Sequence, residues 1–222
     1  MKKYWAIAVM LALVACDRFG RDILFSEPLP MGSRDLARFA GLHQGLYVQA
    51  DDTLHQLQVL PRTVLLRTWS NYGRVGRAAV DSLRRGAREL TESGAWGLSW
   101  HLHAEPMGAD SARVSLLTID TLFQLTDSTR HRLRWRGGYY YLNTADSTDG
   151  TWETRRLSVR GHRLWLADFG SDSTHRTALR RLLALPDVPL SGAYVIQLSP
   201  RNQPLLLRAS ELWRADAPFY RR

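Results

Sequence analysis

The sequence contains very little cysteine and very little lysine. Cys16 is the only cysteine among 222 residues, so no disulfide can form within the chain and a hydrophobic core must hold the fold together. The only lysines are Lys2 and Lys3, so arginine is the only residue after them that carries a fixed positive charge at pH 7. The formal net charge is +9, but the arginines are scattered and accompany no nucleic-acid-binding motif. Nucleic acid is therefore not an expected partner, and the arginine stems are expected to cover apolar strands.

The chain also lacks the common motifs of catalysis. It has no Gly-x-Ser-x-Gly elbow and no Gly-rich loop of the P-loop or dinucleotide type. The acidic residues at positions 146–149 have the wrong spacing for an EF-hand. These absences favour a non-enzymatic protein that acts by binding or as an assembly component.

The first sixteen residues have the arrangement of a secretory signal. Lys2 and Lys3 precede an uncharged apolar run at 5–14, which is shorter than the ~20 residues that a membrane-spanning helix needs. A small residue then stands before Cys16, as at a cleavage site. The segment resembles a bacterial lipoprotein signal, because Leu13-Val14-Ala15-Cys16 matches the lipobox at every position.

This resemblance implies that residues 1–15 are a signal peptide, that Cys16 carries a covalent lipid such as palmitate, and that the acylated N-terminus inserts into membrane lipid. Two or three acyl chains form a lasting anchor, whereas one does not. Residues 16–32 are expected to form a tether and residues 33–222 a single β-rich domain. The expected location is the bacterial cell envelope, on the inner or the outer membrane, with the domain in the periplasm or at the cell surface.

Hydrophobic periodicity predicts a mainly β (α+β) domain. Apolar residues at Ala79, Leu83, Ala87 and Leu90 predict one helix, residues 174–185 a second, and residues 33–41 a short third. A break is expected at 71–76. We expect an antiparallel, strongly curved sheet or a small barrel with two or three short helices. The predicted strands are 45–50, 54–60, 63–69, 96–104, 113–125, 131–136, 139–143, 151–159, 163–167, 194–198 and 205–209.

Two further functions remain open from the residues. The strand that begins with Gly45-Leu46-Tyr47 is distantly similar to strands of calycin-type barrels, which implies a carrier of a hydrophobic ligand as one alternative. The other is a metal-dependent hydrolase. His101, His103 and Glu105 stand two residues apart, so on a strand they project to one side, and zinc accepts such nitrogen and oxygen ligands. A solvent-exposed set of side chains explains the same spacing.

Overall fold

The computed structural model describes residues 23–94, 97–127, 130–145, 149–170, 172–184, 194–215 and 217–222. Within these residues the chain is mainly β, as the sequence predicts, with three α-helices: α2 (Arg77–Glu92), α3 (Ser173–Leu183) and α4 (Gln203–Arg208). The strands are β1 (Ile23–Phe25), β2 (Gly45–Gln49), β3 (His55–Val59), β4 (Thr63–Gly76), β5 (Leu98–Pro106), β6 (Ser111–Gln124), β7 (Arg132–Arg136), β8 (Tyr139–Ala145), β9 (Trp152–Arg160), β10 (Arg163–Phe169), β11 (Tyr194–Ile196), β12 (Trp213–Ala215) and β13 (Phe219–Arg221).

The described strands form one sheet in the order β11-β1-β9-β10-β13-β2-β3-β4-β6-β5. Three strands lie off this path. β8 also pairs with β9, β7 pairs with β8, and β12 pairs with β10. All pairs are antiparallel except β1 with β11. The C-terminal β13 lies between β10 and β2, so the last residues of the chain join its first and second halves. The two ends of the sheet, β11 and β5, do not pair, and the fold is a curved sheet rather than a closed barrel.

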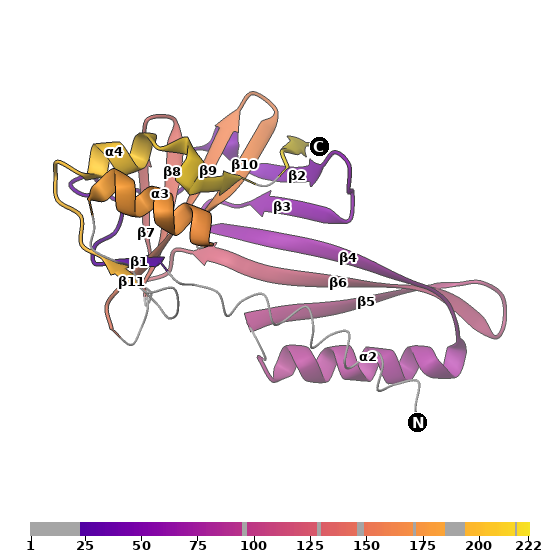
Figure 1. Cartoon of the computed structure of the whole chain (residues 1–222). Helices are drawn as coiled ribbons and strands as arrows, with labels where there is room; N and C mark the ends of the chain where they lie inside the picture. The colour runs from indigo at the N-terminus through magenta and orange to yellow at the C-terminus, as the bar shows by residue number, and fades with distance from the viewer. Residues whose placement is uncertain are drawn as a thin grey trace.

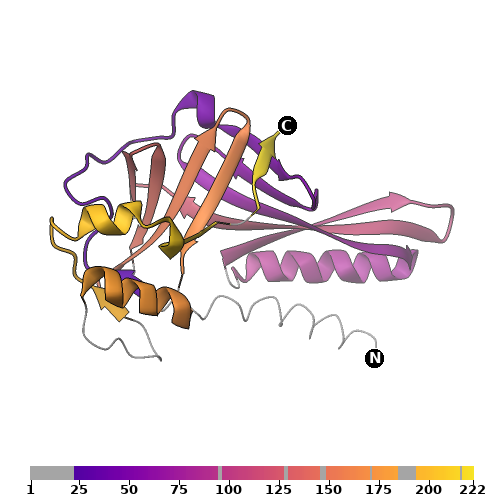
Figure 2. The ribbon, with the colours of Figure 1, turned by 45° about the horizontal axis from the view of Figure 1, so that its top comes forward.

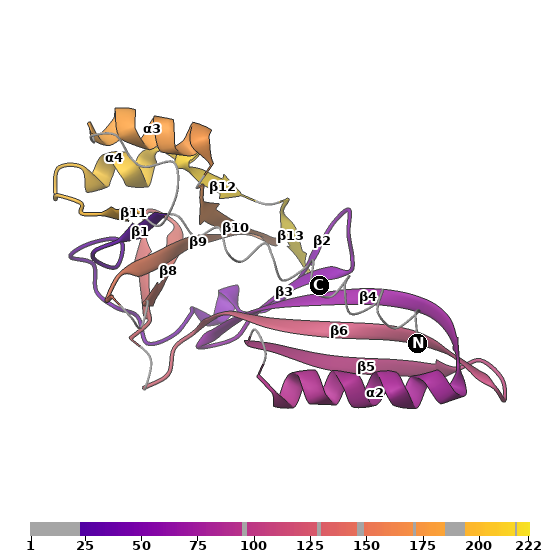
Figure 3. The same ribbon diagram turned by 60° about the horizontal axis from the view of Figure 1, so that its bottom comes forward.

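The molecule consists of a body and an arm (Figures 1 and 2). The body contains the shorter strands together with α3 and α4. The arm consists of the distal parts of β4 and β6, the strand β5 and the helix α2. It projects away from the body, with α2 running alongside β5 (Figure 3). This division explains the long strands, because β4 and β6 belong to both parts.

The concave side of the body sheet is filled by packed side chains. Leu133 of β7, Tyr140 of β8, Tyr47 of β2 and Phe123 of β6 all belong to one buried cluster. These strands are far apart in the sheet order, so they can share a core only because the sheet curves around it. The interior that would be a cavity in a carrier is thus occupied by the protein itself.

A second core lies on the opposite face of the body, beneath α3 and α4. Leu179 of α3 and Leu206 of α4 are fully buried against Tyr141 and Trp213. Asp172 caps the first turn of α3 by accepting hydrogen bonds from the backbone N–H groups of residues 174 and 175. The two helices therefore cover the convex face only at one end of the sheet.

The arm is held together by a long ladder and by one helix. β4 pairs with β6 from Thr63 opposite Gln124 to Gly76 opposite Ser111, with a register shift between Asn71 and Gly73. Gly73 has φ +74°, a conformation that glycine adopts readily at such an irregularity. Helix α2 buries Val80 and Ala87 against β5 and β6, as its predicted apolar side requires.

The N-terminal boundary of the domain differs from the expected one. Residues 1–22, which include the predicted signal peptide and Cys16, lie outside the described residues. Residues 23–32, expected in the tether, belong to the fold: β1 lies in the sheet and Leu29 is fully buried. The side chain of Asn143 holds Leu29 in place, accepting from its N–H and donating to its C=O, both at 2.7 Å.

Three other local predictions are wrong. Residues 33–40 form no helix, because Leu36 and Phe39 donate backbone hydrogen bonds to Leu133 and Pro61 instead. Residues 71–76 continue β4, since pairing with β6 outweighs the turn preferences of the local sequence. Residues 203–208 form α4 rather than a strand; a short apolar run is compatible with either structure, and tertiary packing selects one.

Candidate functional site at the free edge of β5

Strand β5 forms one end of the sheet. It pairs on one side with β6, from Leu98 opposite Asp120 to Pro106 opposite Ala112. Among the strands that the structure describes, none pairs with its other side. An edge strand presents unpaired N–H and C=O groups to any chain that can align with it. This long edge is the first feature of the candidate site.

A hydrogen bond from α2 shows which backbone groups of β5 face the free edge. The N–H of Trp100 donates to Thr91 Oγ1 at 2.8 Å, and the Thr91 hydroxyl lies 3.2 Å from the Trp100 carbonyl oxygen. Both backbone groups of Trp100 therefore point away from β6. Because these groups alternate sides along an antiparallel strand, those of Leu102 and Ala104 point outward too. Pro106 continues the series, and its missing N–H removes no bond to β6.

A groove runs between α2 and this edge. It has a volume of about 450 Å³ and is lined by side chains from residues 84–92 of α2 and by residues 100–103 of β5. Figure 3 shows the helix following the strand along the arm. Where Thr91 contacts Trp100 the helix covers the edge, and beyond that point the backbone of Leu102 and Ala104 receives no side-chain hydrogen bond from any described residue.

Trp100 supplies a buried donor without an acceptor. Its side chain lines the groove and packs with Ala87 and Leu116, and the residue is only 7% exposed. The indole Nε1–H has no hydrogen-bond partner among the described residues. A buried donor left without an acceptor costs about 1–3 kcal/mol.

Basic side chains dominate the rim of the groove. Arg84 and Arg88 line it from exposed positions on α2, with Glu92 as the acidic lining residue. Arg84 lies 3.6 Å from Asp81, but both side chains are more than half exposed, and such pairs contribute only ~0–1 kcal/mol. The arginines are therefore available to a ligand that carries carboxylates.

His101, His103 and Glu105 alternate along β5 with Trp100, Leu102 and Ala104, which pack against α2, so their side chains share the other face, as their spacing predicts. All three are exposed. His101 and His103 also line the strand side of the groove. The ring of His103 contacts Trp69 at a centroid distance of 5.0 Å, and Glu105 lies opposite Arg113 of β6. Among the described residues, no group of three or more His, Cys, Asp or Glu side chains is arranged to hold a metal ion. Zinc binding by this set stays a prediction from the sequence.

A partly buried charge cluster lies on one part of the concave face. Arg155 lies 3.3 Å from the carboxylate of Glu153 and 2.9 Å from that of Asp168. Burial by itself would lower the pKa of the Arg155 guanidinium, but the carboxylates of Glu153, Asp168 and Asp120 outweigh it and raise the pKa. The cluster keeps one guanidinium charged inside the fold. The sequence contained no signal for this cluster, because its members come from β6, β9 and β10.

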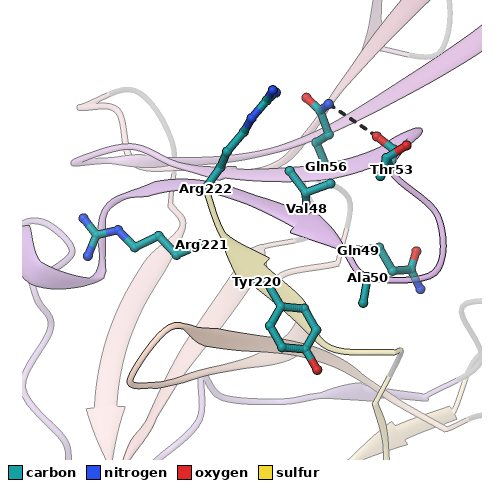
Figure 4. A pocket seen from close by; sticks show the side chains of 8 residues that line it. All are labelled: Val48, Gln49, Ala50, Thr53, Gln56, Tyr220, Arg221 and Arg222. Carbon is teal, nitrogen blue, oxygen red and sulfur yellow. Dashed lines mark hydrogen bonds between the residues drawn. The ribbon is translucent and has the colours of Figure 1, made fainter.

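Another hollow, of about 680 Å³, lies where β13 joins β2 (Figure 4). Tyr220, Arg221 and Arg222 point in different directions there, and Gln56 donates to the carbonyl of Thr53. The Arg221 guanidinium donates to the backbone carbonyls of Leu42 and Gln44. The polar side chains that line this hollow thus make hydrogen bonds within the fold or point apart, and they do not converge on one ligand position.

Comparison with protein-family models, with curated proteins and with solved structures finds no match to this chain. No helix among the described residues has both the length and the apolarity to cross a membrane. Function must therefore be argued from the residues and their geometry. Thr91 and the Trp100 indole were not predicted as site residues, because only the packing of α2 beside the edge gives them a role.

Proposed function

We propose that this chain is a lipid-anchored, non-enzymatic protein of the bacterial envelope that binds an extended segment of a partner protein along β5. The anchor is the acylated Cys16 implied by the lipobox. The binding element is the arm, which carries its open strand edge away from the body. The protein acts in this proposal as an assembly component: one end is fixed in the membrane and the other adds a partner strand to its sheet.

One observation carries the proposal, namely the outward-facing backbone of Leu102 and Ala104 beside the groove. An incoming strand gains its affinity from main-chain hydrogen bonds to such an edge and its specificity from pockets for alternate side chains. Here one side of that strand meets α2, Trp100 and Leu102, so apolar side chains fit there. The rim arginines Arg84 and Arg88 favour Asp or Glu in the same segment.

The test uses random peptides displayed on phage and selected against the purified domain. We expect selected peptides to be extended, apolar at alternate positions and rich in Asp or Glu. Hydrogen exchange should show rapid exchange of the amides of Leu102 and Ala104 in the free protein and their protection on binding. The variant Ala104→Pro should bind the peptides about tenfold more weakly, because it loses one hydrogen bond of the edge and its pyrrolidine ring obstructs an incoming strand.

The matched control is Ala104→Val, which keeps the N–H and has a side chain suited to strands. Both variants should retain the circular dichroism spectrum and thermal midpoint of the parent, because the N–H lost in Ala104→Pro faces the free edge. Equal peptide binding by Ala104→Pro and Ala104→Val would refute strand addition at β5. If protection of these amides increased with protein concentration in the absence of peptide, the occupant of the edge would be a second copy of the chain. That result would also refute the proposed partner.

A further inference from the structure

Arg156 is a buried arginine on the convex face of the body, away from the arm. Its side chain belongs to β9, and the residue is only 8% exposed. Its Cζ lies 4.2 Å from the ring centroid of Tyr139 and 4.7 Å from that of Trp213. Aromatic faces attract a guanidinium and hold its plane in position. The residue is therefore oriented by packing before any ligand arrives.

The charge of Arg156 has no carboxylate partner among the described residues. Its side chain donates a long hydrogen bond from Nη1 to the carbonyl of Leu207 (3.5 Å) and a second hydrogen bond to the Tyr141 hydroxyl. Burial lowers the pKa of the guanidinium, although Tyr139 and Tyr141 act against that shift. A guanidinium has five N–H donors, so most of them lack a strong acceptor. The neighbouring Arg155, in contrast, faces the other side of the sheet and has two carboxylates.

A cavity of about 200 Å³ opens beside Arg156. Arg160, whose guanidinium lies 3.4 Å from the Tyr139 hydroxyl, provides a second cation at its rim. The buried Ser158 and the small Ala167 line the space, and Trp165 lines it as well. This space is larger than a single water molecule needs. It therefore fits the end group of a larger molecule.

We propose that this cavity binds an oxyanion carried on a sugar ring, with Arg156 and Arg160 as donors to the anion and Tyr139 and Trp165 against the ring. Arginine's planar fork matches carboxylate and phosphate oxygens in pairs, and aromatic walls suit the apolar face of a ring. Such end groups occur on envelope polysaccharides and on lipid head groups. The site is independent of the β5 groove, since it lies on β8, β9 and β10.

The experiment titrates the protein with glucose 1-phosphate, with inorganic phosphate and with glucose, and follows the indole N–H resonances of Trp165 and Trp213. We expect saturable shifts with glucose 1-phosphate at a dissociation constant of about 1 mM or below, weaker binding of phosphate, and none of glucose. Arg156→Met should weaken binding by about tenfold or more, because it removes charged donors but keeps the stem. Glucuronate in place of glucose 1-phosphate then distinguishes a carboxylate from a phosphate source.

Arg160→Met provides a second variant, and because Arg160 is exposed it leaves the fold intact even if Arg156→Met does not. It should also weaken binding severalfold. Arg163→Met is the matched control, since Arg163 is exposed on the adjacent strand, lies over Tyr220 and does not line the cavity. Absence of saturable binding, or equal binding by Arg160→Met and Arg163→Met, would overturn the proposal. If inorganic phosphate bound as tightly as glucose 1-phosphate, the proposal that the site recognises a sugar ring would be overturned.

Discussion

Thr91 and Trp100 join the last turn of α2 to the edge strand through a single hydroxyl group. Thr91 Oγ1 accepts from the Trp100 N–H at 2.8 Å, and its own proton has two acceptors within reach, the carbonyls of Ala87 at 3.0 Å and Trp100 at 3.2 Å. This contact covers the edge of β5 at Trp100, whereas the outward-facing backbone groups of Leu102 and Ala104 have no side-chain hydrogen bond from a described residue, although α2 packs against their side chains.

Replacing Thr91 by valine tests this contact. Thr91→Val keeps the shape of the side chain but leaves the Trp100 N–H without its acceptor, and we expect a loss of about 1 kcal/mol in the free energy of unfolding. Urea denaturation measures the loss, and hydrogen exchange at the Trp100 amide should accelerate. Thr91→Ser, which keeps the hydroxyl, is the control. If the valine and serine variants had the same stability and the same exchange rate at Trp100, the contact would have no energetic role.

The second prediction concerns Asn143, which is fully buried. Asn143→Ala leaves the N–H and C=O of Leu29 without partners and removes the acceptor of the Thr154 hydroxyl, which donates to Asn143 Oδ1 at 2.8 Å. We expect a destabilisation of about 2–4 kcal/mol by urea denaturation. Asn71→Ala on the exposed part of β4 is the control and should change stability by less than about 0.5 kcal/mol. Similar losses in both variants would mean that residues 23–32 are not held through Asn143.

The third prediction concerns pH. Partial burial, followed by the charge of Arg221, lowers the pKa of His43 below its usual 6.5. The unfolded chain therefore takes up a proton at this residue before the folded protein does, and stability present above about pH 6.5 is lost as the pH falls below that value. His43→Gln should reduce the loss of stability between pH 7.5 and 5.5, measured as urea midpoints. His162→Gln, at an exposed turn, should leave the loss unchanged; a profile for His43→Gln that matches the parent's would contradict the assignment.

The fourth prediction addresses the histidine pair of β5. Because His101 and His103 are exposed, the double variant His101→Ala/His103→Ala should change the free energy of unfolding by less than about 1 kcal/mol. Elemental analysis of the purified protein should find no stoichiometric zinc. One zinc per chain in the parent, lost in the double variant, would instead support the metal-dependent alternative and would argue against a non-enzymatic protein.

The fifth prediction concerns the anchor. Intact-mass spectrometry of native protein should show a chain that begins at Cys16 and carries fatty acyl groups, and the protein should fractionate with membranes. Cys16→Ala should lose the acyl mass and the membrane association, because no other cysteine is present. Ser26→Ala, in the segment that follows β1, should retain both. An unmodified sulfur in native material would remove the basis for the envelope location.

Local sequence patterns predicted much of the secondary structure. The alternation at 132–136, with Leu133 buried, and the adjacent strands β9 and β10 follow from neighbouring residues alone, and so do α2 and α3. These elements were predictable because hydrophobic periodicity and turn-forming residues are properties of short stretches of sequence. The same reasoning failed for 71–76 and 203–208, where pairing with β6 and burial of Leu206 decide the structure.

The sequence by itself determined that the chain is mainly β and that its one cysteine, Cys16, allows no disulfide within the chain. It also supplied Leu13-Val14-Ala15-Cys16, the residues on which the predicted anchor depends. Only the tertiary structure decided that β13 joins β10 to β2, that β5 is left at the edge beside α2, and that Arg156 is buried between aromatic rings. These features depend on contacts between residues distant in the chain. Their free energies come from surfaces brought together by the whole fold, and no local pattern of residues encodes them.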